Sequence, residues 1–299
     1  MKISGVARAM ALVVALVGSG LMPVSAQADA LSQFLSGASK DCVGCELANA
    51  DLKHRDLSGG NLAGANLKGA DLYAAKLVGT DCTGCNLDGA RLKRADLTGA
   101  VLSRASAQNG NFHAAELRNA KFDGASLNGA NFNRTDLSQA DLSSSHLVGA
   151  MFYAANLSKA NFTGADLSQG MLGHARMPQA DLSGVTAVGA DFSEAAMRGV
   201  KFGAAQLDGS MFDHGDLRDV ILAWASLVDA RLPWADLRGA SLAGSTMTGT
   251  SLYSADLRGS DLSGAKLNDA TLRRAHVTGA KFDQAVLSGV TMPDGTTHP

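Results

Sequence analysis

Every fifth residue of this chain is apolar over most of its length. From Cys42 to Met292, all 51 positions in this register carry an apolar residue, and 33 of them are Leu. The residue two places earlier is small, being Ala at 32 of the 50 positions from Cys45 to Val290. An internal repeat this strict outranks other sequence signals of fold.

A five-residue period predicts a coil that turns a corner after every unit. A strand alternates between its two faces with period two, so an odd repeat cannot continue as a flat strand. In the unit that starts at Ala235, this residue and Leu237 are expected inside, Asp236 and Arg238 outside, and Gly239 at a corner, where a positive φ costs glycine little. Four units close a coil of about twenty residues, and coils stack about 4.8 Å apart through backbone hydrogen bonds. The repeat therefore predicts a parallel β-helix of about 13 coils, about 60 Å long.

The nine phenylalanines of the repeat support four sides per coil. They fall into only two of the four classes that a twenty-residue coil allows: Phe122, Phe162, Phe202 and Phe282 in one, and Phe112, Phe132, Phe152, Phe192 and Phe212 in the other. The two classes are ten residues apart, which places them on opposite sides. We expect their rings to fill the bore along one axis, as dense packing requires.

The pattern A-(D/N)-(L/F)-x-x resembles the pentapeptide-repeat family over residues 41–293. Clear units are Ala50-Asp51-Leu52, Ala130-Asn131-Phe132 and Ala255-Asp256-Leu257. The resemblance implies an all-β fold, a right-handed quadrilateral parallel β-helix with the small residue and Leu or Phe inside. Residues 31–40 look like the start of many such proteins, in which a short helix caps the first coil. Leu31, Phe34 and Leu35 have the i, i+3, i+4 spacing expected to cover the open N-terminal end.

The C-terminal end of the repeat shows no such cap. Pro293 stops the pattern, and residues 294–299 form a short polar tail. An uncovered end of stacked strands is a site for pairing with another chain. We therefore expect an end-to-end homodimer through the C-terminal coil.

Residues 1–28 do not follow the repeat and have the layout of a secretory signal peptide. Lys2 and Arg8 precede the apolar run 10–17, and small-residue cleavage sites end at Ala26, Ala28 and Ala30. The apolar run is too short for a membrane span with normal flanks. We predict export to the periplasm or beyond, with no membrane span in the mature chain; the alternative is an uncleaved anchor.

The charge balance gives no indication of a nucleic-acid partner, and we predict none. The formal net charge is −2, with 26 basic and 28 acidic residues. Such a near-neutral surface lacks the basic footprint of a nucleic-acid-binding protein.

The four cysteines form two CxxC pairs, Cys42 with Cys45 and Cys82 with Cys85. Two such pairs indicate zinc, a redox motif or disulfides. They lie forty residues apart, so two coils, about 10 Å, separate them, which is too far for one tetrahedral zinc site. All four occupy inward repeat positions, which leaves local disulfides in an oxidising compartment, buried free thiols, or a metal or redox function.

No constellation of catalytic residues stands out. Ser and Asp recur throughout as repeat positions, and the seven histidines are expected on the surface. Glycines recur as corners, so a G-x-G match has no value as a phosphate-loop signal. We predict no catalytic, cofactor-binding or metal-binding residue, no cofactor and no enzymatic activity.

Two sets of outward residues are candidates for the surface that carries function. Arg198, Arg218, Arg238 and Arg258 share one position on four successive coils, and three aspartates stand two residues before the last three of them: Asp216, Asp236 and Asp256. We expect an ion-pair ladder, in which each exposed pair contributes little to stability; the alternative is an anion-binding stripe.

The second set is aromatic and apolar. Tyr73, Tyr153 and Tyr253 share one outward position, and one coil carries four further residues at outward or corner sites: Ile221, Trp224, Val228 and Trp234. Grouped exposed aromatics often mark contact surfaces, so these residues are predicted to form an interaction surface. The alternative is that the rings only cover corners.

These observations predict a non-enzymatic exported scaffold with an unidentified protein partner. The family resemblance supplies one alternative, a rod that mimics DNA and protects type II topoisomerases such as gyrase from quinolones. That role needs a strongly acidic rod in the cytoplasm. A second alternative is an envelope redox protein that uses the CxxC pairs.

Overall fold

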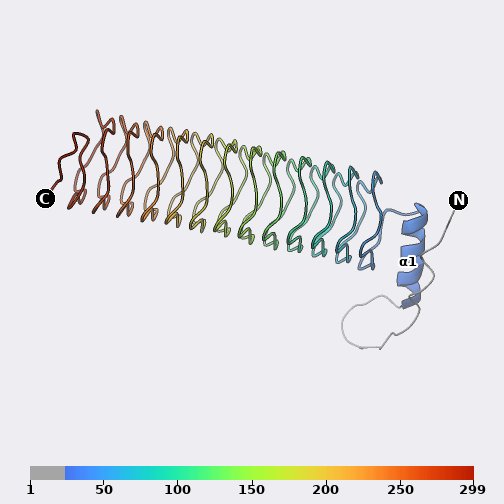
Figure 1. Ribbon diagram of the computed structural model, residues 1–299. Helices are drawn as coiled ribbons and strands as arrows, with labels where there is room; N and C mark the ends of the chain where they lie inside the picture. Colours follow the sequence, from blue (N-terminus) through green and yellow to red (C-terminus); the bar gives the residue numbers. More distant parts are fainter. Residues whose placement is uncertain (1–23) are drawn as a thin grey trace.

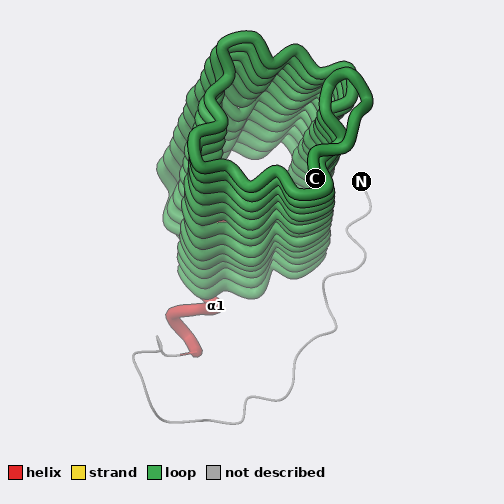
Figure 2. The backbone as a smooth tube through the Cα atoms, turned by 90° about the vertical axis from the view of Figure 1, so that its left-hand side faces the viewer, coloured by secondary structure: helices red, strands yellow, loops and turns green. Residues whose placement is uncertain are grey.

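The computed structural model describes residues 24–299, so most of the predicted signal peptide lies outside the described residues. One helix, α1 (Val24–Ser36), stands at one end of a long rod of stacked coils (Figure 1). The coils contain no extended strands; each five-residue unit contributes one isolated bridge residue, as the looped trace in Figure 2 shows. No helix among residues 24–299 has the length and apolar character that a bilayer crossing requires.

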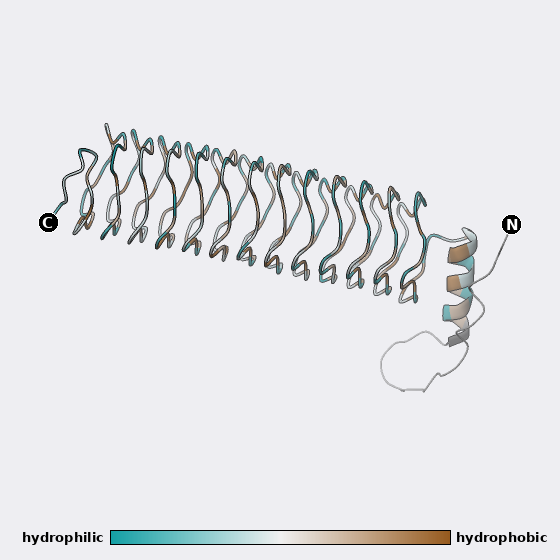
Figure 3. Cartoon of the chain, viewed as in Figure 1, coloured by the Kyte–Doolittle hydropathy of each residue, from teal (hydrophilic) through white to brown (hydrophobic). Residues whose placement is uncertain are grey.

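Every coil is joined to the next by a parallel ladder with a constant spacing. Bridges link each residue to the one twenty positions later, from Glu46 with Asn66 to Thr271 with Thr291. Each coil thus contains four units, and the fold is a right-handed β-helix, as predicted. Hydrophobic and hydrophilic residues interleave along each coil (Figure 3).

The unit that begins at Ser126 shows how the backbone is satisfied. The amide of Ser126 donates to Ala105 O of the preceding coil (2.9 Å), and the amide of Leu127 donates to His146 O of the next coil (2.7 Å). The amide of Gly129 also reaches the next coil, at Val148 O (2.9 Å). In many units the remaining amide finds a side chain: Ser138 N, for example, donates to Asp136 Oδ1 at 3.0 Å. Asp and Asn recur before the apolar residue because their side chains accept the amide two residues on.

Each corner is a β-turn that starts at the large apolar residue. Ala130 N donates to Leu127 O (3.0 Å), and Gly129, the third residue of this turn, has a φ of 66°. A positive φ at that position is the mark of a type II turn. The predicted corner Gly239 has a φ of 68° and Ala235 and Leu237 are buried, which confirms the assignment of positions within the unit.

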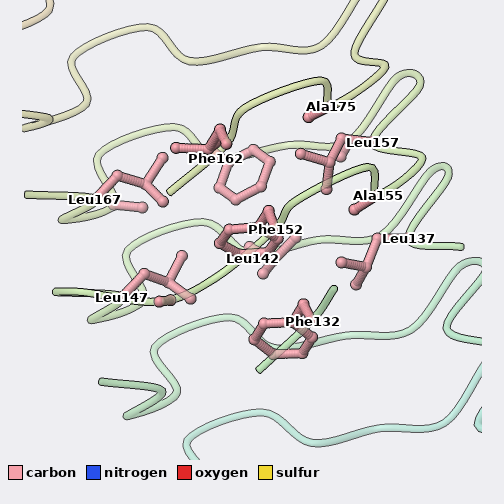
Figure 4. Close-up of a cluster of buried hydrophobic side chains, with 14 of the residues drawn as sticks. Phe132, Leu137, Leu142, Leu147, Phe152, Ala155, Leu157, Phe162, Leu167 and Ala175 are labelled. Carbon is pink, nitrogen blue, oxygen red and sulfur yellow. The ribbon is translucent and has the colours of Figure 1, made fainter. Parts of the chain in front are cut away.

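The bore is filled by two kinds of aromatic contact. Phe132 stacks on Phe112 (centroids 4.8 Å apart) and on Phe152 (5.0 Å) along one side of the rod. Phe162 meets Phe152 edge-to-face from the opposite side at 5.9 Å. Figure 4 shows the rings of Phe132, Phe152 and Phe162 between leucines on either side of the bore. The predicted filling along one axis is confirmed.

Four faces of the rod are named here by the buried residue at the centre of each in one coil. These residues are Leu147, Phe152, Leu157 and Phe162. Each face contains the named residue, the residue before it, the two residues after it, and their equivalents at multiples of twenty positions. Residues close in sequence therefore diverge around the rod, whereas residues twenty apart lie one above the other.

Helix α1 covers the N-terminal end of the rod, as predicted, but with a different set of residues. Phe34 is fully buried, and Ala30 and Leu31 pack against the core. Gln27 Nε2 donates to Gly44 O (3.2 Å), so the covering stripe extends towards the N-terminus from Phe34. The prediction for Leu35 is wrong, because one further residue rotates its side chain by about 100° around the helix, and it is 50% exposed.

The helix also begins earlier than the predicted cap at 31–40, and the three candidate cleavage sites lie within it. The segment before residue 31 contains several alanines, which have the highest intrinsic helix propensity. The helical pattern therefore extends across the expected boundary.

The C-terminal tail folds back on the last unit instead of leaving it. Thr297 forms an antiparallel bridge with Thr291, and His298 N donates to Val290 O (2.8 Å). Val290 is consequently fully buried. The other core residues of the last coil remain partly exposed, as at Val277, Phe282 and Leu287.

Candidate interaction surface

The outer side of the Phe152 face carries most of the exposed rings. Tyr73, Tyr153 and Tyr253 all lie on this face, at the position directly after the buried residue. Met151, Met171 and Met211 occupy the position before the buried residue on the same face. The structure thus places the predicted tyrosines in one line, but along several coils.

Near the C-terminal end of this face, four side chains from successive coils form a continuous stack, here called the Trp234 cluster. The His214 ring is parallel to the Trp234 indole, with centroids 4.9 Å apart. Trp234 meets Tyr253 edge-to-face at 5.5 Å. Arg274 lies over the Tyr253 ring and donates from Nη1 to its hydroxyl oxygen (2.8 Å). Trp234 is held on both sides and still 51% exposed.

Around Tyr153 the same face is hollowed. A cavity of about 370 Å³ opens there, lined by residues of four neighbouring coils: Asn133, Met151, Tyr153, Met171, Gly173, His174, Asp191, Ser193 and Glu194. The His174 ring meets Tyr153 edge-to-face at 5.1 Å, and its Nδ1 lies 3.3 Å from Glu194 Oε2. We call this the Tyr153 pocket.

The four residues predicted to form a patch in one coil do not lie together. Ile221 and Trp224 are on the Phe162 face, Val228 is on the Leu147 face, and Trp234 is on the Phe152 face. The single patch expected from the sequence is therefore wrong, because ten residues along one coil carry the chain to the opposite side of the rod. Trp224 is 76% exposed and lies above Gly244, where a Cβ atom would come within 2.6 Å of its indole ring.

The arginine ladder lies on the Leu157 face, and each of its arginines is paired with an aspartate. Arg218 donates from Nε and Nη2 to both carboxylate oxygens of Asp216, at 2.7 Å each. The pairs Arg238 with Asp236 and Arg258 with Asp256 have the same bidentate geometry. Arg198 has no aspartate two residues before it and instead pairs with Asp219 of the next coil at 3.1 Å.

These contacts make the ladder a network of ion pairs. Arg218 Nε also lies 3.6 Å from Asp236 Oδ2 of the next coil, which links neighbouring pairs. The hydrogen bonds from Arg218 lower the pKa of the Asp216 carboxyl, and those from Arg258 lower the pKa of Asp256. With each guanidinium held by a carboxylate, the ladder has the ion-pair form and presents no uncompensated positive stripe.

Both CxxC pairs are disulfides inside the bore. The Cα atoms of Cys42 and Cys45 are 5.3 Å apart and those of Cys82 and Cys85 are 5.2 Å apart, each pair joining the first and last residues of a turn. All four residues are at most 2% exposed. Residues 24–299 contain no free cysteine and no cluster of three His, Cys, Asp or Glu side chains suited to a metal ion.

The repeat is matched by a known family model. The model described as "Pentapeptide repeats (8 copies)" matches overlapping segments that together span residues 45–169 and 172–289. The chain belongs to the pentapeptide-repeat family. Proteins of this family generally act as non-enzymatic scaffolds, and no enzymatic family is indicated. The comparison with curated proteins returns no match.

Solved structures of other pentapeptide-repeat proteins are similar to this chain. HetL of the cyanobacterium Nostoc sp. strain PCC 7120, involved in heterocyst differentiation regulation, is 30% identical, with 90% of this chain and 98% of HetL covered and a TM-score of 0.30. A trypsin-treated variant of QnrB1, a plasmid-mediated fluoroquinolone resistance protein, is 20% identical over 64% and 89% of the two chains, with a TM-score of 0.34. A protein from the Arabidopsis thaliana thylakoid lumen is 28% identical over 43% and 69%, with a TM-score of 0.15.

Sequence reasoning missed the Tyr153 pocket. Its signal is present once the sequence is written in rows of twenty, because Gly173 then falls between Tyr153 and Ser193 in one column. The five-residue period alone does not show this gap, since it compares neighbours along a coil and not between coils.

Proposed function

We propose that the protein is an exported, non-enzymatic scaffold, a rigid quadrilateral rod of about 13 coils that binds a protein partner on its Phe152 face. The observation that carries this proposal is the Trp234 cluster. Tryptophan, tyrosine and arginine are the residue types that dominate binding energy at protein interfaces. Here one of each lies in a single exposed stack together with His214.

The cluster is suited to binding because its geometry exists before any partner arrives. His214 and Tyr253 hold the Trp234 ring from the coils before and after it. Immobilising a side chain on association costs about 0.5–1.5 kcal/mol, and a ring that is already held avoids most of that cost. The continuous hydrogen-bond ladder beneath it keeps the spacing between these coils constant.

Export is supported by the N-terminal sequence and by the cysteine chemistry. The first 28 residues have the layout of a signal peptide, and two disulfides are typical of proteins in an oxidising compartment. Cell fractionation with N-terminal sequencing tests this directly. We expect a mature N-terminus close to Gln27, Asp29 or Leu31 in the periplasm or medium, whereas an intact Met1 in the cytosol would overturn export.

The chain supplies a matched control for the binding surface. A photoreactive phenylalanine derivative placed at Trp234 should cross-link a discrete partner in living cells, and His214→Ala should reduce the yield by loosening the stack. The same derivative at Trp224, which is more exposed but lies on the opposite face, should give no such adduct. Equal adducts from both sites would show that exposure alone, and not the cluster, captures the partner.

We also propose that two rods associate end to end through the C-terminal coil. Val277, Phe282 and Leu287 are partly exposed there, and within the described rod their backbone amides have no backbone acceptor. A second copy related by twofold symmetry can cover these apolar side chains. Analytical ultracentrifugation should show a dimer that Phe282→Asp dissociates and that Phe122→Leu, buried inside the rod far from its C-terminal end, leaves intact. A wild-type monomer at high concentration would overturn the proposal.

A further inference from the structure

The three tyrosines of the Phe152 face occupy the same position of the repeat, so two of them serve as references for the third. Tyr73 is followed by Arg94 twenty-one residues later, and Arg94 Nη1 lies 3.4 Å from the Tyr73 hydroxyl. Tyr253 has Arg274 at the same offset, with Nη1 at 2.8 Å from its hydroxyl and the guanidinium carbon 5.8 Å from the ring centroid. The chain thus supplies a guanidinium to each of these tyrosines.

A second basic residue follows each of these tyrosines at an offset of twenty. Lys93 follows Tyr73 in the next coil, and Arg273 follows Tyr253. At Tyr153 neither offset carries Lys or Arg: Gly173 stands at the offset of twenty, and His174, which packs on the Tyr153 ring, at the offset of twenty-one. The Tyr153 pocket includes Gly173, at the repeat position that carries Lys93 or Arg273 after the other two tyrosines.

Neither backbone conformation nor crowding requires a glycine at position 173. Gly173 does not have a positive φ. A Cβ atom there would meet Ser193 O at 3.7 Å, Tyr153 Cδ2 at 3.8 Å and Asp191 Oδ2 at 4.0 Å, all ordinary contact distances. The effect of the glycine is to leave space between an aromatic ring and two oxygen acceptors.

The charge of this space favours a cation. Asp191 Oδ1 accepts the amide of Ser193 (2.9 Å), whereas Oδ2 of the same carboxylate borders the gap. Glu194 contributes a second carboxylate, whose Oε2 lies 3.3 Å from His174 Nδ1, and no Lys or Arg lines the pocket. A cation between an aromatic ring and a carboxylate gains a cation–π contact and a charge-assisted hydrogen bond together.

We infer that the Tyr153 pocket binds an organic cation, a guanidinium or alkylammonium group that occupies the space left at Gly173, the repeat position at which Lys93 and Arg273 follow the other two tyrosines. The cavity volume of about 370 Å³ lies in the range of small-ligand sites. Met151 and Met171 at its rim are apolar and adaptable, which suits the alkyl stem that carries such a group. This inference does not depend on export or on the Trp234 cluster.

Isothermal titration calorimetry of the mature protein with N-acetylarginine amide tests the inference. We expect saturable binding, and no binding of N-acetylcitrulline amide, which has nearly the same shape without the charge. A glycine-flanked arginine peptide identifies the source of the cation: much tighter binding of the peptide indicates a side chain of a partner protein, whereas equal affinity indicates a free small molecule. Absence of arginine binding, or equal binding of citrulline, would overturn the inference.

Three variants localise the site. Gly173→Arg supplies the missing basic side chain and should abolish binding without lowering the melting temperature, because a side chain has room there. Tyr153→Leu should weaken binding about fivefold or more, whereas Trp224→Leu, which removes an exposed ring on the opposite face, should leave it unchanged. If Gly173→Arg folds normally and binds arginine as well as the wild type does, the cation lies elsewhere and the assignment to this pocket is wrong.

Discussion

Arg55 joins the rod to its N-terminal cap by two contacts with a single residue, Phe34. Its Nη2 donates to the Phe34 carbonyl oxygen at 2.6 Å, and its guanidinium carbon lies 4.7 Å from the centroid of the Phe34 ring. Arg55 occupies an inward position that is Ala in most units. At the first coil the bore is not closed by a preceding coil, so a long side chain there can reach α1.

Arg55→Ala is expected to detach the cap although it restores the most common residue of the repeat. The change removes the cation–π contact and the charge-assisted hydrogen bond to the Phe34 carbonyl oxygen, which keeps only the Gly37 amide as a donor (3.0 Å). Together these losses should lower the free energy of unfolding by about 1–3 kcal/mol. Chemical denaturation measures this loss, and limited proteolysis should cut near α1. Arg273→Ala, at an exposed position near the other end, is the control. Equal stability of the two variants would show that Arg55 does not hold the cap.

Truncating Phe132 should destabilise the rod strongly, because its ring stacks on phenylalanines of both neighbouring coils. Phe132→Ala leaves a cavity between Phe112 and Phe152 and should cost about 3–5 kcal/mol. Phe132→Leu keeps most of the volume and should cost less than about 1.5 kcal/mol, since Leu172 already fills this position on the same face. Urea unfolding compares the two; similar losses would mean that the ring stack itself, and not the filled volume, is what stabilises the bore.

The arginine ladder should make stability depend on pH through its aspartates. Hydrogen bonds from Arg258 hold the pKa of Asp256 below its ordinary value of 3.8. Because the unfolded carboxyl takes up a proton at a higher pH than the folded one, this pair stabilises the protein above pH 3.8 and loses its effect as the pH falls further. The melting temperature of Asp256→Asn should therefore lie below the wild type at pH 7, and the difference should shrink towards pH 3. A difference that is independent of pH would mean that ionisation of Asp256 is not the cause.

The buried disulfides should resist reduction while the rod is folded. All four cysteines are at most 2% exposed, so a thiolate reductant cannot reach them without opening a coil. Mass spectrometry after reduction and alkylation should show no label on the native protein and four labels in guanidinium chloride. Rapid labelling of native protein would instead support the redox interpretation of the CxxC pairs.

Removing one disulfide should lower the free energy of unfolding only moderately, because each disulfide closes a loop of only four residues. The chain-entropy relation gives about 2 kcal/mol for a loop of this size. The double variant Cys82→Leu with Cys85→Ala restores the residues common at these inward positions, so better packing should offset part of that loss. A thermal unfolding scan of the variant against the wild type under oxidising conditions measures the remainder.

Much of the architecture follows from the five-residue period alone. The alternation of inward and outward positions, the corner at Gly239 and the two opposite rows of phenylalanines were all predicted from the sequence and are confirmed. These features depend on the direction of the Cα–Cβ bond, and a regular backbone repeat determines that direction at every position. The prediction for Leu35 failed because α1 is a helix with a period of its own. The five-residue repeat therefore does not determine which side of α1 faces the rod.

The contacts between coils were decided only in three dimensions. A long outward side chain has partners in its own coil and in the coils before and after it: Arg218 takes its bidentate contact within its coil at Asp216, whereas Arg198, with no aspartate there, pairs with Asp219 of the next coil. The Trp234 cluster and the gap at Gly173 likewise join residues twenty or twenty-one positions apart. The sequence by itself determined which side of the coil each residue faces. Which side chains meet was decided by the stacking of coils. Coils lie about 4.8 Å apart, so each outward side chain can reach partners in several coils, and the space that its neighbours occupy determines which one it contacts.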